Sequence, residues 1–127
     1  MPEQRDVRWE DIERDTSFEY GDRYGVSAEL GSENIRCSVI RFYPGDRGPL
    51  HYHDDPIEEY YVILDGKIDI VFEDETLEAE EGRCIFTPPG VRHYPHNTYE
   101  TPAVILSVTS PSVEMAGMNF IEDWDEE

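Results

Sequence analysis

Apolar and polar residues alternate over short stretches through the middle of the chain. A repeat of two residues is the spacing of a β-strand with one buried face. It predicts seven or eight strands, at residues 36–43, 50–53, 59–64, 67–73, 76–80, 83–87, 91–96 and 103–110. Asp65-Gly66 signals a hairpin between two of these strands, and Pro44-Gly45 ends another. No stretch between them has helical periodicity over more than two turns, so the chain is expected to be all-β.

Short strands separated by turns are typical of a β-sandwich or barrel, and a small jelly-roll β-barrel is the closest architecture. The 127 residues fit a single domain, since most domains contain about 100–150 residues. Residues 36–110 are predicted to form the barrel core. Residues 1–33 are expected to cover it as an arm with short strands or a helical turn. Residues 111–127 are expected to form an acidic tail that lies back over an apolar surface.

The chain is strongly acidic, with 30 Asp and Glu residues against 10 Lys and Arg and a formal net charge of −20 at pH 7. Nucleic-acid partners are not expected, because phosphate binding needs clustered basic residues. The same balance argues against binding to an anionic membrane. Such a surface repels itself in dilute salt and is tolerated when salt screens it. We therefore expect a salt-adapted, halophilic protein; an acidic protein that charge merely keeps soluble is the alternative.

Two further features concern the cellular compartment. The longest apolar runs have four or five residues, far fewer than the ~20 that cross a membrane. The first residues lack the basic start and apolar stretch of a secretory signal, so a cytoplasmic protein is expected. Cys37 and Cys84 are too few for a disulfide scaffold and are expected to be reduced thiols packed as small apolar groups.

The candidate chemistry lies in the histidines, which stand at positions 51, 53, 93 and 96. His51 and His53 are one residue apart, so on a strand both rings point to the same face. His93 follows about forty residues later, just beyond a Pro-Pro-Gly turn. With a carboxylate from Glu58 or Glu59, three imidazoles suit a divalent first-row metal that keeps one or two positions open. The lack of thiolate ligands argues against a structural zinc site.

These residues resemble the two sequence motifs of the cupin family. The first motif reads Gly, five residues, His-x-His, three or four residues, Glu, six residues, Gly; its places are taken here by Gly45, His51, His53, Glu59 and Gly66. The second reads Gly, five residues, Pro-x-Gly, two residues, His, three residues, Asn; it is matched at every spacing by Gly82, Pro88, Gly90, His93 and Asn97. The resemblance covers residues 45–97 and implies a small single-domain cupin.

The chain departs from the first motif at one place. Five residues separate His53 from Glu59, one more than usual, whereas Glu58 has the usual distance to His53 but the wrong distance to Gly66. The turn at Gly66 should set the direction of alternation along the preceding strand. Glu59 is therefore favoured over Glu58 as the carboxylate ligand, and the longer loop 54–58 is expected to bulge outward.

The resemblance implies that His51, His53, Glu59 and His93 bind one divalent transition metal inside the barrel, namely Fe, Mn, Ni or Zn. Cupins with this ligand set include dioxygenases, decarboxylases, isomerases and lyases. A metal-dependent enzyme with a small-molecule ligand is therefore expected, either dioxygenase-like or an isomerase or lyase. The alternative is a non-catalytic cupin module that binds or senses a small molecule or a metal. Small cupins commonly dimerise, which implies a homodimer in contact through the N-terminal arm or the outer face of a sheet.

Other side chains are placed by the same alternation. Tyr61 shares a strand face with the favoured carboxylate and is a candidate substrate-binding residue. Arg41 lies between Ile40 and Phe42, which are expected to face inward, so Arg41 is expected outside the pocket. With the opposite alternation, Arg41 would be the natural anchor for an anionic substrate. His96 is expected to face away from the metal. No catalytic residue is identified.

Overall fold

The computed structural model describes residues 3–112, 118–122 and 124. Its strands are β1 (Asp22–Tyr24), β2 (Arg36–Phe42), β3 (His51–His53), β4 (Glu58–Asp65), β5 (Lys67–Phe72), β6 (Thr76–Glu80), β7 (Cys84–Thr87), β8 (His93–His96), β9 (Ala103–Ser110) and β10 (Met118–Phe120). The helical segments are a single 3₁₀ turn η1 (Trp9–Asp11) and the short helix α1 (Val26–Leu30). Each of the eight predicted strands is present, with ends that differ by two residues at most.

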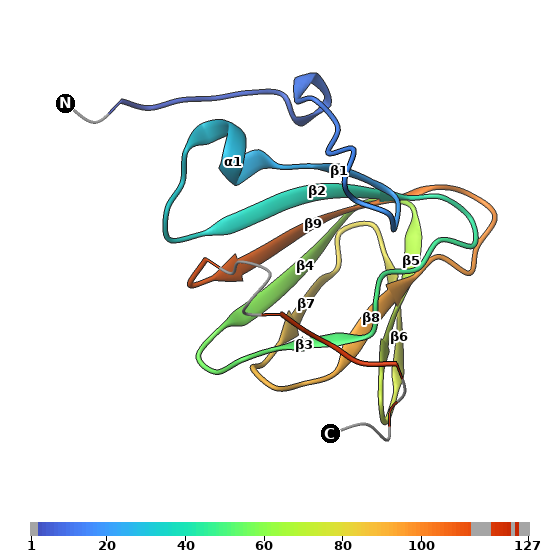
Figure 1. Cartoon of the computed structure of the whole chain (residues 1–127). Coiled ribbons are helices and arrows are strands. Elements are labelled where there is room, and N and C mark those ends of the chain that lie inside the picture. The colour runs from blue at the N-terminus through green and yellow to red at the C-terminus, as the bar shows by residue number, and fades with distance from the viewer. Residues whose placement is uncertain (1–2, 113–117, 123, 125–127) are drawn as a thin grey trace.

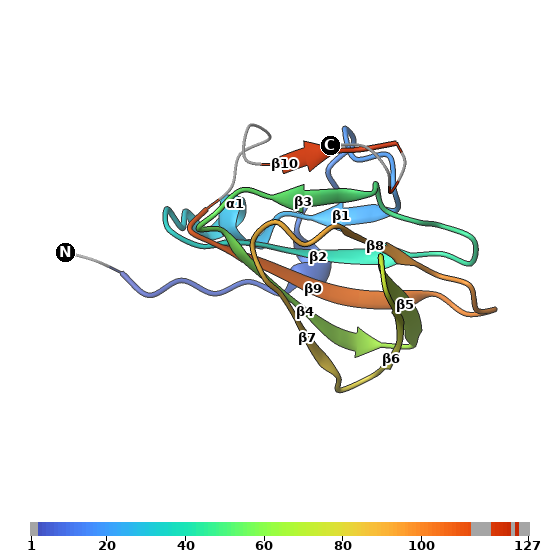
Figure 2. The same cartoon turned by 90° about the horizontal axis from the view of Figure 1, so that it is seen from below.

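The strands form two five-stranded antiparallel sheets that face each other (Figure 1). The first sheet has the order β1-β2-β9-β4-β7 and the second the order β10-β3-β8-β5-β6. Most strands that lie side by side are therefore far apart in the sequence, which is typical of a jelly roll. Figure 2 shows from below how β10 lies beside β3 at the edge of the second sheet. The predicted all-β jelly-roll barrel is confirmed.

The core lies between the sheets and is built by alternate residues of each strand. On β4, Glu59, Tyr61 and Ile63 are buried, whereas Glu58 and Tyr60 are exposed. The largest fully buried apolar side chains are Phe42, Ile63, Ile68, Ile70 and Ile105. Burial of one such side chain contributes about 1.5–3 kcal/mol, and branched isoleucines also favour the extended backbone. This apolar half of the interior makes the barrel a rigid support for side chains at its other end.

The turn at Asp65-Gly66 is present, but the predicted hairpin is wrong. β4 pairs with β7 and β9 in the first sheet, whereas β5 pairs with β6 and β8 in the second. The turn thus carries the chain from one sheet to the other. Gly66 has a φ of +76°, and a Cβ atom there would lie 2.5 Å from the carbonyl oxygen of Pro102. Only glycine fits this sharp crossing, so the dipeptide marked a turn correctly without specifying which strands pair.

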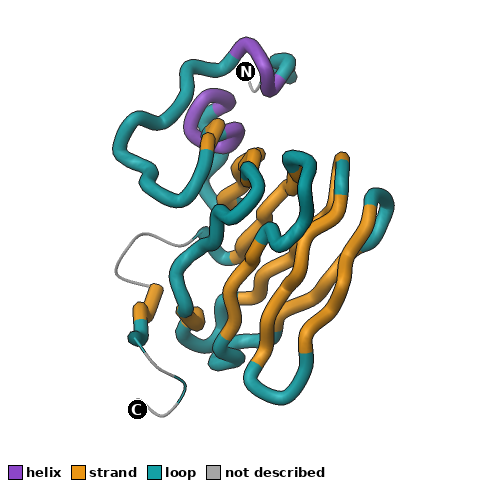
Figure 3. The backbone as a smooth tube through the Cα atoms, turned by 90° about the vertical axis from the view of Figure 1, so that its right-hand side faces the viewer, coloured by secondary structure: helices purple, strands orange, loops and turns teal. Residues whose placement is uncertain are grey.

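The predicted arm and tail both add strands to the barrel edges. β1 pairs with β2, and the tail residues that are described include β10, which pairs with β3. Trp9 of η1 packs against Tyr24, with ring centroids 5.2 Å apart, and against the guanidinium of Arg41 at 5.4 Å. The arm therefore covers the outer face of the first sheet near β2. Figure 3 shows both helical segments gathered at this end of the barrel.

Two smaller predictions concern the cysteines and membrane-spanning segments. Cys37 and Cys84 are both free, as expected. Cys84 is exposed, however, because its position on β7 falls on the outward side of the alternation, so it is not packed as predicted. Within the described ranges, no helix has the length and apolar character needed to span a membrane.

Candidate metal centre

The inner face of the first sheet is polar at one end and apolar at the other. Three neighbouring rows across β2, β9 and β4 consist, in order, of Arg36, Thr109 and Glu59; Ser38, Ser107 and Tyr61; and Ile40, Ile105 and Ile63. Residues directly opposite each other on paired strands point to the same face. The polar rows therefore form one continuous surface in the barrel interior, and the isoleucine row separates them from the apolar core.

The second sheet places three imidazoles opposite this polar surface. His51 and His53 on β3 are 4% and 3% exposed, so both rings point inward as their spacing predicts. β8 runs antiparallel beside β3 and pairs His93 directly with His51. Their ring centroids lie 4.3 Å apart, and His93 is completely buried. Residues forty positions apart in the sequence thus meet because β3 and β8 are neighbours in space.

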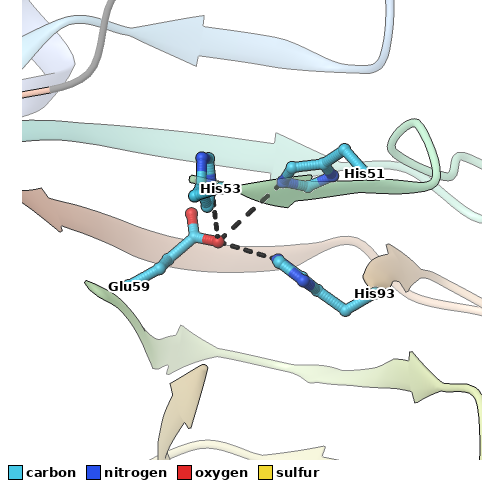
Figure 4. A group of neighbouring side chains, drawn as sticks. All are labelled: His51, His53, Glu59 and His93. Atoms are coloured by element: carbon cyan, nitrogen blue, oxygen red, sulfur yellow. Dashed lines mark hydrogen bonds and ion pairs between the residues drawn. The ribbon is translucent and has the colours of Figure 1, made fainter. Parts of the chain in front are cut away.

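The Glu59 carboxylate lies among the three rings (Figure 4). Its Oε1 atom is 2.8 Å from Nε2 of His93, 3.1 Å from Nε2 of His53 and 3.9 Å from Nε2 of His51. The other oxygen, Oε2, accepts a hydrogen bond of 2.9 Å from the hydroxyl of Ser107 on β9. Ser107 thereby fixes the orientation of the carboxylate and leaves Oε1 directed at the imidazoles.

Backbone carbonyls determine which ring nitrogens face the centre. Nδ1 of His51 donates to the carbonyl oxygen of Pro49 at 2.8 Å, and Nδ1 of His93 donates to that of Val91 at 2.8 Å. A carbonyl can only accept, so Nδ1 carries the hydrogen and Nε2 of a neutral ring presents a lone pair. His53 differs, since its buried Nδ1 has no hydrogen-bond partner among the described residues.

Two Nε2 lone pairs and a carboxylate oxygen thus converge on one small volume. Two lone pairs and a carboxylate oxygen in such contact would repel one another, so either a proton on Nε2, which lets the ring donate to Glu59, or a metal cation must lie between them. All four ligand atoms lie within 4.8 Å of one another. Donors around a transition metal at about 2.1 Å stand roughly 3–4 Å apart, and the distances from Oε1 are close to this range at 2.8, 3.1 and 3.9 Å. His51, His53, Glu59 and His93 could therefore bind a metal ion, as the sequence predicts.

Burial and neighbouring groups shift several pKa values here. Burial, with a smaller effect of the neighbouring His93, lowers the pKa of His51 to about 4, which favours a neutral ring. Burial alone would raise the pKa of Glu59, but hydrogen bonds to His53 and His93 hold that pKa below its usual value. Burial and the charge of Glu59 raise the pKa of Tyr61 well above its usual range. The site therefore holds an ionised carboxylate beside a tyrosine that keeps its proton.

The cluster lies at the wall of a cavity of about 450 Å³ between the sheets. His51, His53, Glu59 and Tyr61 line it from the barrel, and Met118 and Phe120 of β10 line it from the tail. A cavity of this volume is in the range that proteins use for small-molecule ligands, about 300–1,000 Å³. The arrangement can thus bring a small molecule against the candidate metal position.

The structure distinguishes between the two candidate carboxylates. Glu59 is 4% exposed and contacts all three imidazoles, whereas Glu58 is exposed on the outer face of β4. The extra residue of the preceding loop is taken up in a turn closed by a hydrogen bond of 2.8 Å from Ile57 N–H to the Asp54 carbonyl oxygen. Residues 54–56 are exposed, so the loop bulges outward as expected, and Glu59 still reaches the imidazoles.

Other sequence predictions can be compared with their positions in the structure. Tyr61 lies on the cavity wall beside the cluster, where its use in substrate binding stays a prediction. Arg41 lies outside the cavity against Trp9. His96 is outside the cluster. Asn97 is fully buried and donates to the carbonyl oxygens of Phe42 and Thr101, both at 2.9 Å, so it fixes a turn.

Among the polar residues of this cavity that sequence reasoning missed are Ser107, Arg23 and Arg36. The sequence pattern could have identified Arg36 as inward-facing, because Arg36 shares the alternation of Ile40 and Phe42, which were predicted to face inward. Ser107 could not be found, since only the register between β9 and β4 places it opposite Tyr61. Arg23 lies in a three-residue strand that the sequence pattern does not reveal.

Comparison with known proteins agrees with this description. A family model described as a cupin domain matches residues 38–109, which is more than half of the chain. An uncharacterised protein of Aquifex aeolicus (strain VF5) is 34% identical over 64 residues, which make up 50% of this chain and 51% of that protein. The chain thus spans about half the length of this curated relative.

Three solved structures share the fold over nearly the whole chain. An uncharacterised double-stranded β-helix protein from Klebsiella pneumoniae has a TM-score of 0.76 at 19% identity, over 95% of this chain and 100% of that one. A sugar phosphate isomerase of the cupin superfamily from Silicibacter pomeroyi has a TM-score of 0.77 at 18% identity, over 94% and 93%. The polyketide cyclase RemF from Streptomyces resistomycificus has a TM-score of 0.80 at 18% identity, over 97% and 89%. At these identities the likeness concerns the fold alone.

Proposed function

Since the chain belongs to the cupin family, we propose that it is a metal-dependent enzyme that acts on a small molecule. His51, His53, Glu59 and His93 are the proposed ligands of one divalent transition metal, which is Fe, Mn, Ni or Zn. The observation that carries the proposal is the convergence of three Nε2 atoms on one buried carboxylate oxygen at the wall of a cavity. A structural cluster would have no need of such a cavity.

The residues around the cluster favour isomerase or lyase chemistry on a substrate with oxygen-bearing groups. A bound divalent ion would polarise a substrate oxygen as a Lewis acid. Tyr61 is buried beside Glu59 on the cavity wall, and a tyrosine hydroxyl carries its proton at neutral pH. Its hydroxyl can therefore donate a hydrogen bond to a substrate oxygen as negative charge develops there. Ser107 holds Glu59 in place from the opposite side.

Two fold neighbours are consistent with this choice of reaction class. One is named a sugar phosphate isomerase and another a polyketide cyclase. At 18% identity both neighbours share the fold with this chain, and the activities in their names are not transferred by that likeness. Dioxygenase chemistry is the competing reaction, and a non-catalytic module that binds or senses a small molecule is the competing function.

Elemental analysis of protein purified without added metal tests the metal. We expect about one equivalent of a transition metal per chain, or uptake of one equivalent after dialysis against Fe, Mn, Ni or Zn salts. Less than about a tenth of an equivalent under both conditions would exclude the proposed function, since four preformed donors should retain an ion.

A second experiment tests the reaction class. Metal-loaded protein is incubated in D₂O with small hydroxycarbonyl compounds, and loss of the C–H signal beside the carbonyl is followed by NMR, with oxygen uptake recorded in parallel. Isomerase or lyase chemistry predicts exchange without oxygen uptake, and Tyr61→Phe should slow it about a hundredfold. Oxygen uptake would identify the dioxygenase. Stoichiometric metal with neither signal would favour the binding module.

We further propose that the protein is a cytoplasmic homodimer without nucleic-acid or membrane partners. The outer face of the first sheet favours the dimer. Tyr60 and Phe86 form a cross-strand pair there with ring centroids 5.3 Å apart, and they are 50% and 44% exposed. The arm covers this face near β2 but leaves the aromatic pair uncovered in the single chain. An exposed aromatic pair on a highly charged protein is typical of a contact surface.

A further inference from the structure

The cavity contains a pair of arginines that the proposed metal chemistry does not use. Arg23 of β1 and Arg36 of β2 both line it. The whole chain has only nine arginines and one lysine against 30 acidic residues. Two of the ten basic side chains therefore line the same cavity, in a protein whose net charge is strongly negative.

The backbone places both side chains on the inner face of the sheet. Arg36 shares the alternation of Ser38 and Ile40, which are buried in the interior. Arg23 lies directly opposite Ile40 in the β1–β2 register, so it points to the same side as Ile40. The inward position of the pair thus follows from strand pairing and does not depend on one rotamer.

Arg23 is held in place by contacts along its stem. Its Nε donates to the hydroxyl of Ser38 at 3.2 Å, and its guanidinium lies 5.7 Å from the Phe18 ring centroid. Nη1 is 3.9 Å from a carboxylate oxygen of Asp15, the outer limit of an ion pair. Among the described residues, neither Nη atom of Arg23 makes a hydrogen bond. The planar end of the side chain therefore keeps donors for a ligand.

The two guanidinium groups also affect each other. Burial lowers the pKa of Arg23, and the nearby charge of Arg36 lowers it further. Asp15 and Glu19 also line the cavity, and the charge of Asp15 offsets part of this effect on Arg23. Asp15 is itself engaged by Ser17, whose N–H and hydroxyl donate to one carboxylate oxygen at 3.0 and 2.6 Å. An anion bound between the arginines would be attracted by both guanidinium groups.

The arginine pair lies within reach of the candidate metal position. Arg36, Thr109 and Glu59 occupy one row across three adjacent strands. Strands in a sheet are about 4.8 Å apart, so the Cα atoms of Arg36 and Glu59 are separated by roughly 10 Å. Ser38, Ser107 and Thr109 lie between them on the inner face and make this part of the wall polar. One small molecule can therefore contact both ends.

We propose that Arg23 and Arg36 bind an anionic group, a carboxylate or a phosphate, of the small molecule whose other end lies at the metal centre. This proposal rests on the proposed function and specifies its substrate class as anionic. Guanidinium groups bind carboxylate and phosphate oxygens through two parallel hydrogen bonds. The anion would thereby hold the substrate in a fixed orientation towards Tyr61 and Glu59.

Calorimetric titration of the metal-loaded protein tests the proposal with two pairs of probes. 4-Hydroxybutanoate is compared with 1,4-butanediol, and glycerol 3-phosphate with glycerol; the second member of each pair lacks the anionic group meant for the arginines. We expect the anionic member of at least one pair to bind about tenfold tighter or more. The pair that shows the preference identifies the group as carboxylate or phosphate.

Variants of matched charge connect the preference to the arginines. Arg36→Gln and Arg23→Gln should each reduce the preference for the anionic probe about tenfold. The use of two variants keeps the test valid if one of them fails to fold. Arg41→Gln removes the same charge from β2 on its outer face and should leave the preference within about twofold. A preference that is missing in the native protein, or that persists in both inner variants, would overturn the anion site.

The same samples separate this proposal from the proposed function, because elemental analysis gives their metal content. Metal-free protein is titrated with the same probes. Protein that retains no metal but still prefers the anionic probes through Arg23 and Arg36 would support the anion site and exclude the metal enzyme. Protein that retains metal but does not prefer the anionic probes would support the metal enzyme and exclude the anion site.

Discussion

The two faces of the first sheet use the same strands for opposite purposes. On β4, Glu59 and Tyr61 point inward and are 4% and 3% exposed, whereas their neighbour Tyr60 is 50% exposed. Phe86, opposite Tyr60 on β7, is 44% exposed. At this part of the sheet a carboxylate is thus buried and aromatic rings face outward, which inverts the usual distribution of polar and apolar side chains.

The two faces differ in how they accommodate side chains that are unusual for their position, a buried carboxylate on one and exposed aromatic rings on the other. The buried carboxylate is tolerated because Ser107 and the imidazoles replace the water it loses. For the outer aromatic pair, the structure shows among the described residues the contact of the two rings with each other, and both rings stay about half exposed. A buried polar cluster beside a cavity marks a ligand site, and an exposed apolar pair marks a contact surface. One sheet therefore carries two candidate functional surfaces, one on each face, because successive residues of a strand point to opposite sides.

Removal of one imidazole should have the largest effect on the inner face. His93→Ala is expected to weaken metal binding by more than about a hundredfold, because loss of a hydrogen-bond partner outside the ligand set already costs about 10–100-fold. Metal content measured after gel filtration checks this, with circular dichroism as the control for the β-fold. Full metal retention by a folded His93→Ala protein would show that the ligand assignment is wrong.

Two neighbouring glutamates sharpen the comparison of faces most directly. Glu59→Gln keeps the size of the side chain but removes an anionic donor, and metal affinity is expected to fall about a hundredfold. Glu58→Gln removes the same charge from the outer face and should change the affinity by about twofold at most. Competition with a chelating dye measures both variants. Equal losses would mean that overall charge, and not the inner position, controls metal binding.

A charge on the outer face should separate the proposed dimer from the metal site. Tyr60→Glu is expected to weaken dimerisation about thirtyfold, because an unpaired carboxylate would be buried at the contact. Analytical ultracentrifugation measures the dissociation constant, while metal content should stay unchanged. Ile35→Glu, at a residue that is 47% exposed before β2, is the control. A monomeric native protein, or a dimer unaffected by Tyr60→Glu, would exclude this surface as the interface.

Salt should produce the smallest effect and act on the surface alone. Between dilute and molar KCl, the Tm is expected to rise by about 5 °C, because screening removes repulsion among exposed carboxylates. The affinity of the metal-free protein for metal should change less, since the four donor residues are buried. Differential scanning fluorimetry measures the Tm. A Tm that is constant or falls would contradict salt adaptation.

Local alternation and turn residues made the strands and their inward faces predictable, and the resemblance of the histidine and glutamate spacing to the cupin motifs implied the four donor residues. Period-two alternation depends on a few neighbouring residues only, which is why the sequence alone favours Glu59 over Glu58. The same rule places Arg36 on the inner face beside Ile40. Short elements without a clear period, such as β1 and β10, could not be found in this way.

The sequence by itself determined which residues form strands and which side of each strand faces inward, because both depend on contacts within one segment. Only the tertiary structure decided which strands are neighbours. It sent the chain across from one sheet to the other at Gly66, and it brought Ser107 to Glu59 over 48 positions in the sequence. Strand register is set by hydrogen bonds between distant segments and by the packing of two sheets, and no local pattern encodes those partners.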